Sequence, residues 1–297
     1  MRYDVSLTIE YKYDRASDHA RSLLHLLPRN IPGQQDIAAS LLSVTPSPQE
    51  RWDGVDFFGN ATTWISFLEA IDDFTLTLKT QVTRRSSPPG MDFSSKLADL
   101  GADITELHSI APHVPHHFLG ASPWVSPDPG MTAFARARTT PDMSALTAVL
   151  AVGQALHDYM EFDDKATDVD TPPKDAFAKR RGVCQDFSHI MIACLRGLGI
   201  PAGYVSGFLR TVPPPGQKRL EGADAMHAWI RAWCGSEMGW IEYDPTNAIM
   251  AEDGHIIVAY GRDYSDVSPV RGIMRSSGGH DTKHFVDVIP VMANDPI

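Results

Sequence analysis

The chain has 297 residues, of which 43% are hydrophobic and 21% are charged, and this balance excludes an intrinsically disordered protein. Its formal net charge of -11 argues against a broad nucleic-acid-binding surface, because such a surface needs clustered Lys and Arg. Its apolar runs are shorter than the ~20 residues of a membrane-spanning helix and it lacks a secretory apolar stretch, so we expect a cytoplasmic protein with no membrane or nucleic-acid partner.

Residues 1–83 alternate apolar and polar side chains in the manner of β-strands. Four segments show this pattern, with Pro, Gly and Asn between them: "YDVSLTIEYKY", "AASLLSVTPSP", "VDFFGNATTWISFLE" and "FTLTLKTQVTR". We therefore expect an N-terminal β-rich domain over residues 1–83, built as an antiparallel sheet or sandwich.

Residues 84–143 are rich in Pro and Ser and contain a histidine cluster, "HSIAPHVPHHF". A weak helical pattern follows around residues 131–138. We interpret residues 84–143 as a connecting segment. The cluster of His113, His116 and His117 lacks a carboxylate or thiol at ligand spacing, so we expect a solvated loop and no metal site.

Residues 144–297 read as helices followed by strands. "SALTAVLAVGQALHDYM" has apolar residues at helical spacing behind Ser144 as N-cap, a second helix should begin after Pro172 and Pro173, and a third is predicted in "QDFSHIMIACLRGLG". The strand-like segments are "AGYVSGFLR", "MHAWIRAWC", "GWIEYDPT" and "HIIVAYGRDY". This order predicts an α+β core over residues 144–297. The Pro-rich stretch 211–220 is either a plain connector or a flap over a cleft.

The three cysteines are Cys184, Cys194 and Cys234, which cannot form a fully paired disulfide framework and have no zinc-type CxxC spacing. We expect free thiols, with no metal and no organic cofactor. Cys194 lies among apolar residues in the middle of the third helix and is predicted to be core. Cys234 is predicted to lie in a turn.

Cys184 differs from the other cysteines because it begins the third helix. The reactive species is the thiolate, and a free cysteine with a pKa of ~8.5 is mostly protonated at neutral pH. Unpaired N–H groups and the positive dipole end of a helix favour an anion by up to ~2 kcal/mol. Cys184 is therefore a candidate nucleophile if a base lies near it, and a buried core thiol if none does.

The segment "MHAWIRAWCGSEMGWIEYDPT" supplies a candidate base. A turn at residues 234–237 would place Trp229 opposite Glu242 and His227 opposite Asp244. Residues opposite each other in an antiparallel pair point to the same side, so the carboxylate would hold one ring nitrogen and leave the other for Cys184. His189 lies nearer in sequence, but helical rotation points it away from the thiol, and we expect it to contact a neighbouring element.

Three segments, "RRGVCQDFSH", "MHAWIRAWC" and "WIEYDPTNA", resemble the transglutaminase-like superfamily, whose core presents Cys, His and Asp in this order on a helix and two strands. The resemblance implies Cys184 as nucleophile, His227 as base and Asp244 as the orienting group. "RYDVSLTIEYKYD", "HLLPRNIPGQ" and "DFFGN" resemble the β-rich region before the core in a bacterial subfamily, and "VAYGRDYSDVSPVRG" resembles its C-terminal strand segment. The implied fold is a papain-like core behind a β-sandwich-like domain.

The implied activity is thiol-dependent acyl transfer or hydrolysis on peptide or amide bonds through a thioester, with a peptide, protein or small amide as substrate. One alternative is protein-glutamine crosslinking to an amine. Animal transglutaminases place Trp directly after the nucleophile, whereas Gln185 and Asp186 follow Cys184 here, which favours a peptidase or amidase. The other alternative is a non-catalytic binding scaffold. The sequence gives no indication of oligomeric state.

Overall fold

The computed structural model describes the chain apart from residues 18, 86–89, 212–221, 223, 275–278 and 292–297. The stretch 211–220, considered above as a flap, lies almost entirely outside the described residues. None of the helices in the described part is long and apolar enough to cross a bilayer.

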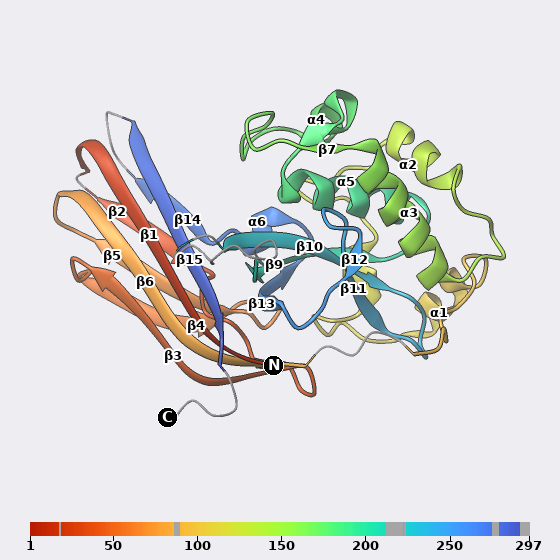
Figure 1. The fold of residues 1–297 in the computed structure, drawn as a ribbon, viewed down its shortest axis with the longest axis horizontal. Helices are drawn as coiled ribbons and strands as arrows, with labels where there is room; N and C mark the ends of the chain where they lie inside the picture. The colour runs from red at the N-terminus through yellow and green to blue at the C-terminus, as the bar shows by residue number, and fades with distance from the viewer. Residues whose placement is uncertain (18, 86–89, 212–221, 223, 275–278, 292–297) are drawn as a thin grey trace, which may run out of the picture.

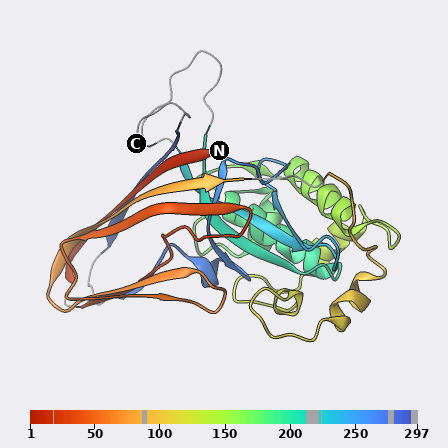
Figure 2. The same ribbon diagram turned by 90° about the horizontal axis from the view of Figure 1, so that it is seen from below.

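Two antiparallel sheets form a sandwich at one end of the molecule (Figures 1 and 2). One sheet has the order β15 (His280–Pro290), β1 (Arg2–Ser17), β6 (Ile71–Arg84) and β3 (Gln35–Thr45). The other has the order β14 (Val270–Met274), β2 (Ala20–Leu24), β5 (Ala61–Phe67) and β4 (Glu50–Val55). Every second side chain of β1 from Tyr3 to Ile9 is buried, as the alternation predicts.

One predicted strand is in fact two. The segment "VDFFGNATTWISFLE" begins with the end of β4, turns at residues 56–60 and continues as β5. The Asp56 carboxylate accepts a hydrogen bond from the Asn60 backbone N–H at 2.8 Å, and Gly59 adopts a φ of 79°. Asp, Gly and Asn favour such a turn strongly enough to interrupt the apolar run.

The C-terminal strands complete the N-terminal sheets. β15 pairs with β1, and β14 pairs with β2, so the span 144–297 expected for the core contributes its last two strands to the sandwich. Pairing between segments so far apart in sequence has no local signature, whereas the alternation within each strand does.

A five-stranded antiparallel sheet, called here the central sheet, forms the rest of the core with its helices. Its order is β12 (Ile249–Met250), β11 (Trp240–Asp244), β10 (Ala225–Trp233), β9 (Ala202–Leu209) and β13 (His255–Gly261). Figure 1 shows most of the helices at the end of the molecule away from the sandwich, with the short helix of residues 264–267 in the middle. Strands and helices together confirm the predicted α+β class with a strand-rich N-terminal region.

The predicted helices are present. α3 (Ala145–Tyr159) begins after Ser144, whose side chain accepts a hydrogen bond from the Thr147 N–H. α4 (Pro173–Lys179) and α5 (Cys184–Gly197) follow, and a short parallel pair, β7 (Glu161–Phe162) and β8 (Arg181–Gly182), flanks α4. Between the sandwich and α3 lie α1 (Leu100–Glu106), the 3-10 helix η1 (Pro115–Phe118) and α2 (Pro129–Arg136). α6 (Tyr264–Val267) follows β13.

The predicted hairpin register is wrong by two residues. Trp233 pairs with Trp240 and Arg231 with Glu242, because the turn occupies residues 234–239. The Cys234 N–H donates to the Gly239 carbonyl, and Gly235 and Gly239 both have positive φ. Since side chains alternate with a period of two, this shift keeps His227 and Asp244 on one face of the sheet as diagonal neighbours.

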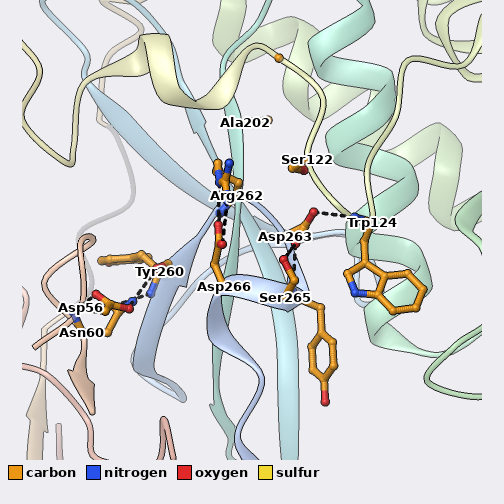
Figure 3. Close-up of polar contacts among 12 residues, drawn as sticks. Asp56, Asn60, Ser122, Trp124, Ala202, Tyr260, Arg262, Asp263, Ser265 and Asp266 are labelled. Atoms are coloured by element: carbon orange, nitrogen blue, oxygen red, sulfur yellow. Dashed lines mark hydrogen bonds and ion pairs between the residues drawn. The ribbon is translucent and has the colours of Figure 1, made fainter. Parts of the chain in front are cut away.

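The sandwich is joined to β13, the edge strand of the central sheet, by side-chain amides. Asn60 donates to the Tyr260 carbonyl at 2.7 Å and accepts from the Tyr260 N–H at 2.8 Å (Figure 3). Gln35 forms the same pair of hydrogen bonds with the backbone of Ile257. Both amides are fully buried. They satisfy backbone groups of this edge that a further strand would otherwise pair with.

The turn after β13 is held to the segment before α2 by a carboxylate. Asp263 accepts hydrogen bonds from the backbone N–H of Trp124 at 2.7 Å and of Ser265 at 2.9 Å (Figure 3). In the same turn, Arg262 forms an ion pair with Asp266 at 2.8 Å. The segment 84–143, predicted to be a connection, thus contributes Trp124, whose ring stacks on His189 of α5.

Candidate active site

Cys184 is the first residue of α5, and its side chain is partly exposed. Asp186 fixes the start of this helix. Its carboxylate accepts hydrogen bonds from the Val183 backbone N–H at 2.9 Å and from the Thr167 hydroxyl at 2.7 Å. These contacts make Asp186 a capping residue of α5.

A glycine before the helix leaves room for that carboxylate. A Cβ added to Gly182 would lie 2.5 Å from an oxygen of Asp186. Asp186 is buried, and burial raises its pKa. Gln185, which follows Cys184, donates a side-chain hydrogen bond to the Val169 carbonyl.

His227 and Asp244 meet in the interior of the protein. His227 Nε2 lies 2.7 Å from Asp244 Oδ2, although the two residues sit on strands whose register differs from the predicted one. Asp244 is the last residue of β11 and is completely buried, and His227 is 9% exposed. The predicted contact between the two side chains is therefore present.

Asp244 is surrounded by hydrogen-bond donors. Its Oδ1 accepts from the backbone N–H groups of Thr246 at 2.9 Å and Asn247 at 3.2 Å. Its Oδ2 accepts from the Asn247 side chain at 2.6 Å and also lies 3.1 Å from His255 Nε2. Burial alone would raise the pKa of Asp244, but these hydrogen bonds and the neighbouring imidazole hold it well below its usual range.

The third member of the group is the thiol. With Nε2 engaged by Asp244, the Nδ1 of His227 is left for Cys184, whose thiol is near enough to contribute to the pKa of the imidazole. Burial lowers the pKa of His227, but the hydrogen bonds to Asp244 and Cys184 and their negative charges outweigh it and raise the pKa to about 10. This environment favours the charged imidazolium form of His227.

Two tyrosines lie near the thiol. Tyr204 on β9 and Tyr264 at the start of α6 are both mostly buried, and burial raises the pKa of each phenol. The charge of Cys184 adds to both shifts. The two rings pack edge-on, with centroids 6.2 Å apart.

The other two cysteines lie in the core. Cys194 and Cys234 are fully buried, and burial raises the pKa of each thiol to about 12. Cys194 lies in α5 and donates to the Met131 carbonyl, and Cys234 lies in the turn after β10, as predicted for both.

His189 does not face the thiol. It is buried, its Nε2 accepts a hydrogen bond from the Tyr264 backbone N–H at 3.1 Å, and its ring stacks on Trp124. Its burial lowers its pKa to about 4. The predicted contact with a neighbouring element is therefore found.

Among the described residues, one group has the spacing of metal ligands, namely His227, Asp244 and His255, whose ligand atoms all lie within 4.8 Å of one another. Both imidazole Nε2 atoms point at the carboxylate and hydrogen-bond to it. A metal ion at this position would displace those contacts. The cluster of His113, His116 and His117 is not such a group, and the His117 ring packs edge-on against Phe57.

His255 and Asn247 were missed by sequence reasoning. Asn247 follows Asp244 within one turn, and an Asp-x-x-Asn spacing is a signal for side-chain capping of a turn. His255 begins a predicted strand, and its contact with Asp244 depends on the order of strands in the central sheet, which local patterns do not reveal.

The chain matches two family models. Residues 132–245 match the transglutaminase-like superfamily core, and residues 3–83 match the bacterial transglutaminase-like N-terminal region. An uncharacterized protein of Mycobacterium tuberculosis is 31% identical over 294 residues, which cover 97% of this chain and 93% of the relative. An uncharacterized protein of Mycobacterium leprae is 29% identical over 279 residues, covering 94% and 95%.

A solved structure shares the fold. The crystal structure of a candidate cysteine protease from Cytophaga hutchinsonii aligns with a TM-score of 0.75, covering 100% of this chain and 92% of that chain. The sequence identity is 20%, so this likeness concerns the fold alone.

Proposed function

Because the chain belongs to the transglutaminase-like superfamily, we propose that it is a cysteine-dependent acyltransferase or hydrolase acting on peptide or amide bonds. Cys184 is the nucleophile, His227 the acid and base, and Asp244 the group that orients the imidazole. The observation that carries the proposal is the position of His227, which hydrogen-bonds to Asp244 through Nε2, leaves Nδ1 for Cys184 and has its pKa raised in part by that thiol.

Acylation uses these groups in order. The Cys184 thiolate attacks the carbonyl carbon of the substrate and forms a tetrahedral intermediate whose oxyanion accepts the backbone N–H of Cys184, an amide without an acceptor in its own helix. The C–N bond then breaks, and the imidazolium of His227 gives its Nδ1 proton to the leaving amine. The products of this half-reaction are a free amine and a thioester on Cys184.

Deacylation reverses the roles. Neutral His227 removes a proton from water, or from an amine, as that acceptor attacks the thioester carbonyl. The C–S bond breaks, the acyl product leaves, and the thiolate–imidazolium pair is restored. Because Gln185 occupies the position of the animal enzymes' Trp, we propose a peptide or amide donor with water as the main acceptor.

The proposal is tested by the pH dependence of iodoacetamide alkylation, followed by peptide mass spectrometry. We expect Cys184 to be labelled rapidly well below the ~8.5 pKa of a free thiol, because the imidazolium stabilises the thiolate. The His227→Gln variant should lose this early labelling, whereas His108→Gln, which changes an exposed histidine, should keep it. Cys194 and Cys234 are internal controls, because their burial should leave them unlabelled until the protein unfolds.

Two outcomes decide between the alternatives. Labelling of Cys184 that rises only near an ordinary thiol pKa, in wild type and His227→Gln alike, would reject the triad and support a binding scaffold. If the thiolate is present, a library of dansylated glutamine and peptide amides, offered with water or with a primary amine, separates hydrolysis from crosslinking.

A further inference from the structure

His255 is the buried side chain next to the site that the proposed reaction leaves without a role. It is the first residue of β13 and is 1% exposed. The Glu252 backbone N–H lies 3.1 Å from His255 Nδ1. Because a backbone N–H can only donate, Nδ1 must be the unprotonated nitrogen of a neutral ring. The proton of His255 is therefore on Nε2.

This tautomer gives the contact with Asp244 a direction. His255 Nε2 lies 3.1 Å from Asp244 Oδ2, so the imidazole donates and the carboxylate accepts. The same oxygen accepts from His227 Nε2 at 2.7 Å. Two imidazole N–H groups therefore converge on one carboxylate oxygen, and one of them belongs to the proposed base.

We propose that His255 is a positioning residue of the Cys184–His227–Asp244 triad, which holds the Asp244 carboxylate in the orientation that aims His227 at the thiol. This inference rests on the proposed function. Asp244 lies at the end of a strand, where its χ angles alone would allow several orientations. With Oδ1 fixed by two backbone N–H groups and Oδ2 by His255 and Asn247, only one remains.

Ring packing and backbone hydrogen bonds restrict the movement of His255. Its ring packs edge-on against Trp229, with ring centroids 5.2 Å apart. Its backbone N–H donates to the Glu252 carbonyl at 2.9 Å, and its carbonyl accepts from Nε of the buried Arg84 at 3.0 Å. Arg84 is the last residue of β6, so the first sheet of the sandwich contacts the residue that positions the triad.

The tautomer also distinguishes positioning from metal binding. A metal ion bound at Nε2 of His255 would require the ring proton to move to Nδ1, where the Glu252 N–H already points. The backbone therefore favours an Nε2–H donor at this position over a metal ligand.

The test compares two substitutions of His255 that differ in the donor. His255→Gln can place an amide N–H near the position of Nε2, and His255→Leu removes the donor. We expect His255→Leu to slow iodoacetamide labelling of Cys184 at neutral pH by about tenfold or more, the usual loss when a supporting hydrogen bond to a site ligand is removed, and His255→Gln to restore most of the rate. The matched control is His25→Leu, because His25 is buried in the sandwich away from Asp244.

A second readout does not depend on reactivity. In ¹⁵N NMR spectra of histidine-labelled protein, His255 should show a protonated Nε2 and an unprotonated Nδ1. At neutral pH His227 should show protons on both ring nitrogens in wild type and His255→Gln, because its pKa is raised to about 10, and should lose part of this doubly protonated form in a folded His255→Leu. If His255→Leu fails to fold, the wild-type spectrum still tests the proposal, because it shows which ring nitrogen of His255 carries the proton.

The outcomes separate the two hypotheses. A protonated Nδ1 on His255, or a folded His255→Leu variant with wild-type labelling and an unchanged His227 spectrum, would overturn the positioning role while leaving the triad intact. Ordinary thiol reactivity in the wild type would overturn the proposed function instead, and the His227 spectra would then decide the role of His255 alone.

Discussion

At the scale of single residues, Asp244 determines the charge state of the site. Water cannot stabilise its carboxylate, because the side chain is completely buried, so the hydrogen bonds described above do so instead. A carboxylate held in this way keeps His227 charged, and in the proposed mechanism a charged His227 stabilises the thiolate of Cys184. The reactivity proposed for Cys184 therefore begins with a residue that does not touch the sulfur.

This arrangement gives the stability of the protein a defined dependence on pH. The pKa of Asp244 is lower in the folded protein than the ~3.9 of an unfolded chain. Its contribution to stability is therefore complete above pH ~4 and is lost as the pH falls below that value. We expect Asp244→Asn to reduce the free energy of unfolding by about 3–5 kcal/mol at neutral pH, because it leaves the His227 charge buried and unpaired.

Urea denaturation of both proteins over a series of pH values measures this contribution. The difference in stability between wild type and Asp244→Asn should narrow as the pH falls below ~4. Asp142→Asn is the control, because the Asp142 side chain is 91% exposed and its substitution should give a small difference at every pH. An Asp244→Asn difference that stays constant down to pH ~3 would contradict the lowered pKa.

Sequence reasoning predicted the contact between His227 and Asp244 but not the residues that support it. Cys184 could be found because a helix start is a local feature, and His227 and Asp244 because strand parity survives an error of two residues. His255 contacts Asp244 only because β13 and β11 belong to one sheet, and that is a property of the topology. Residues that hold a site in place are hidden from sequence whenever their contacts cross between strands.

At the scale of elements, the contact between α3 and β11 fixes the strand that carries Asp244. Gly153 of α3 lies directly against the Tyr243 ring, and a Cβ at this position would be 2.1 Å from a ring carbon. Tyr243 is 2% exposed, so its ring is enclosed by the core. The glycine therefore sets how closely the helix approaches the strand.

We expect Gly153→Ala to destabilise the protein by about 1–3 kcal/mol through overpacking, even though alanine is the better helix former. Gly101→Ala in α1 is the matched control, because a Cβ there meets no atom within 4 Å, and it should be neutral or slightly stabilising. Urea unfolding followed by circular dichroism measures both. Equal stability of the two variants would mean that α3 can move away from β11 at no cost.

Helices and strands with a local pattern were predicted well, whereas the strand register that depends on the length of a turn was predicted poorly. The apolar spacing of α3 and α5 and the alternation of β1 and β6 are properties of each segment alone. The hairpin between β10 and β11 was placed two residues out of register because its turn is longer than a tight one, with glycines at positive φ on both sides. The amino acids of a turn suggest that it exists more reliably than they fix its length.

At the scale of the whole molecule, the sandwich and the central sheet are connected by buried polar contacts as well as by the chain. Gln35 and Asn60 satisfy the backbone of β13 at Ile257 and Tyr260, which would otherwise be an unpaired edge in the interior. The chain also returns from the core to add β14 and β15 to the sandwich sheets. We therefore expect the two parts to unfold as one cooperative unit.

Gln35→Ala tests this coupling, because it leaves a buried N–H and a buried carbonyl of Ile257 without partners. The expected loss in free energy of unfolding is about 2–4 kcal/mol, since each unsatisfied buried group costs ~1–3 kcal/mol.

In a cooperative protein the substitution should lower the urea midpoint measured by circular dichroism and the midpoint measured by thiol labelling of Cys194 to the same extent. Cys194 reports on the core because it is fully buried in α5, far in sequence from Gln35. Gln154→Ala, an exposed position on α3, should leave both midpoints unchanged. If Cys194 kept its wild-type midpoint in Gln35→Ala while the circular dichroism transition shifted, the sandwich would be an independent unit, and the contact of Arg84 with His255 could not couple it to the site.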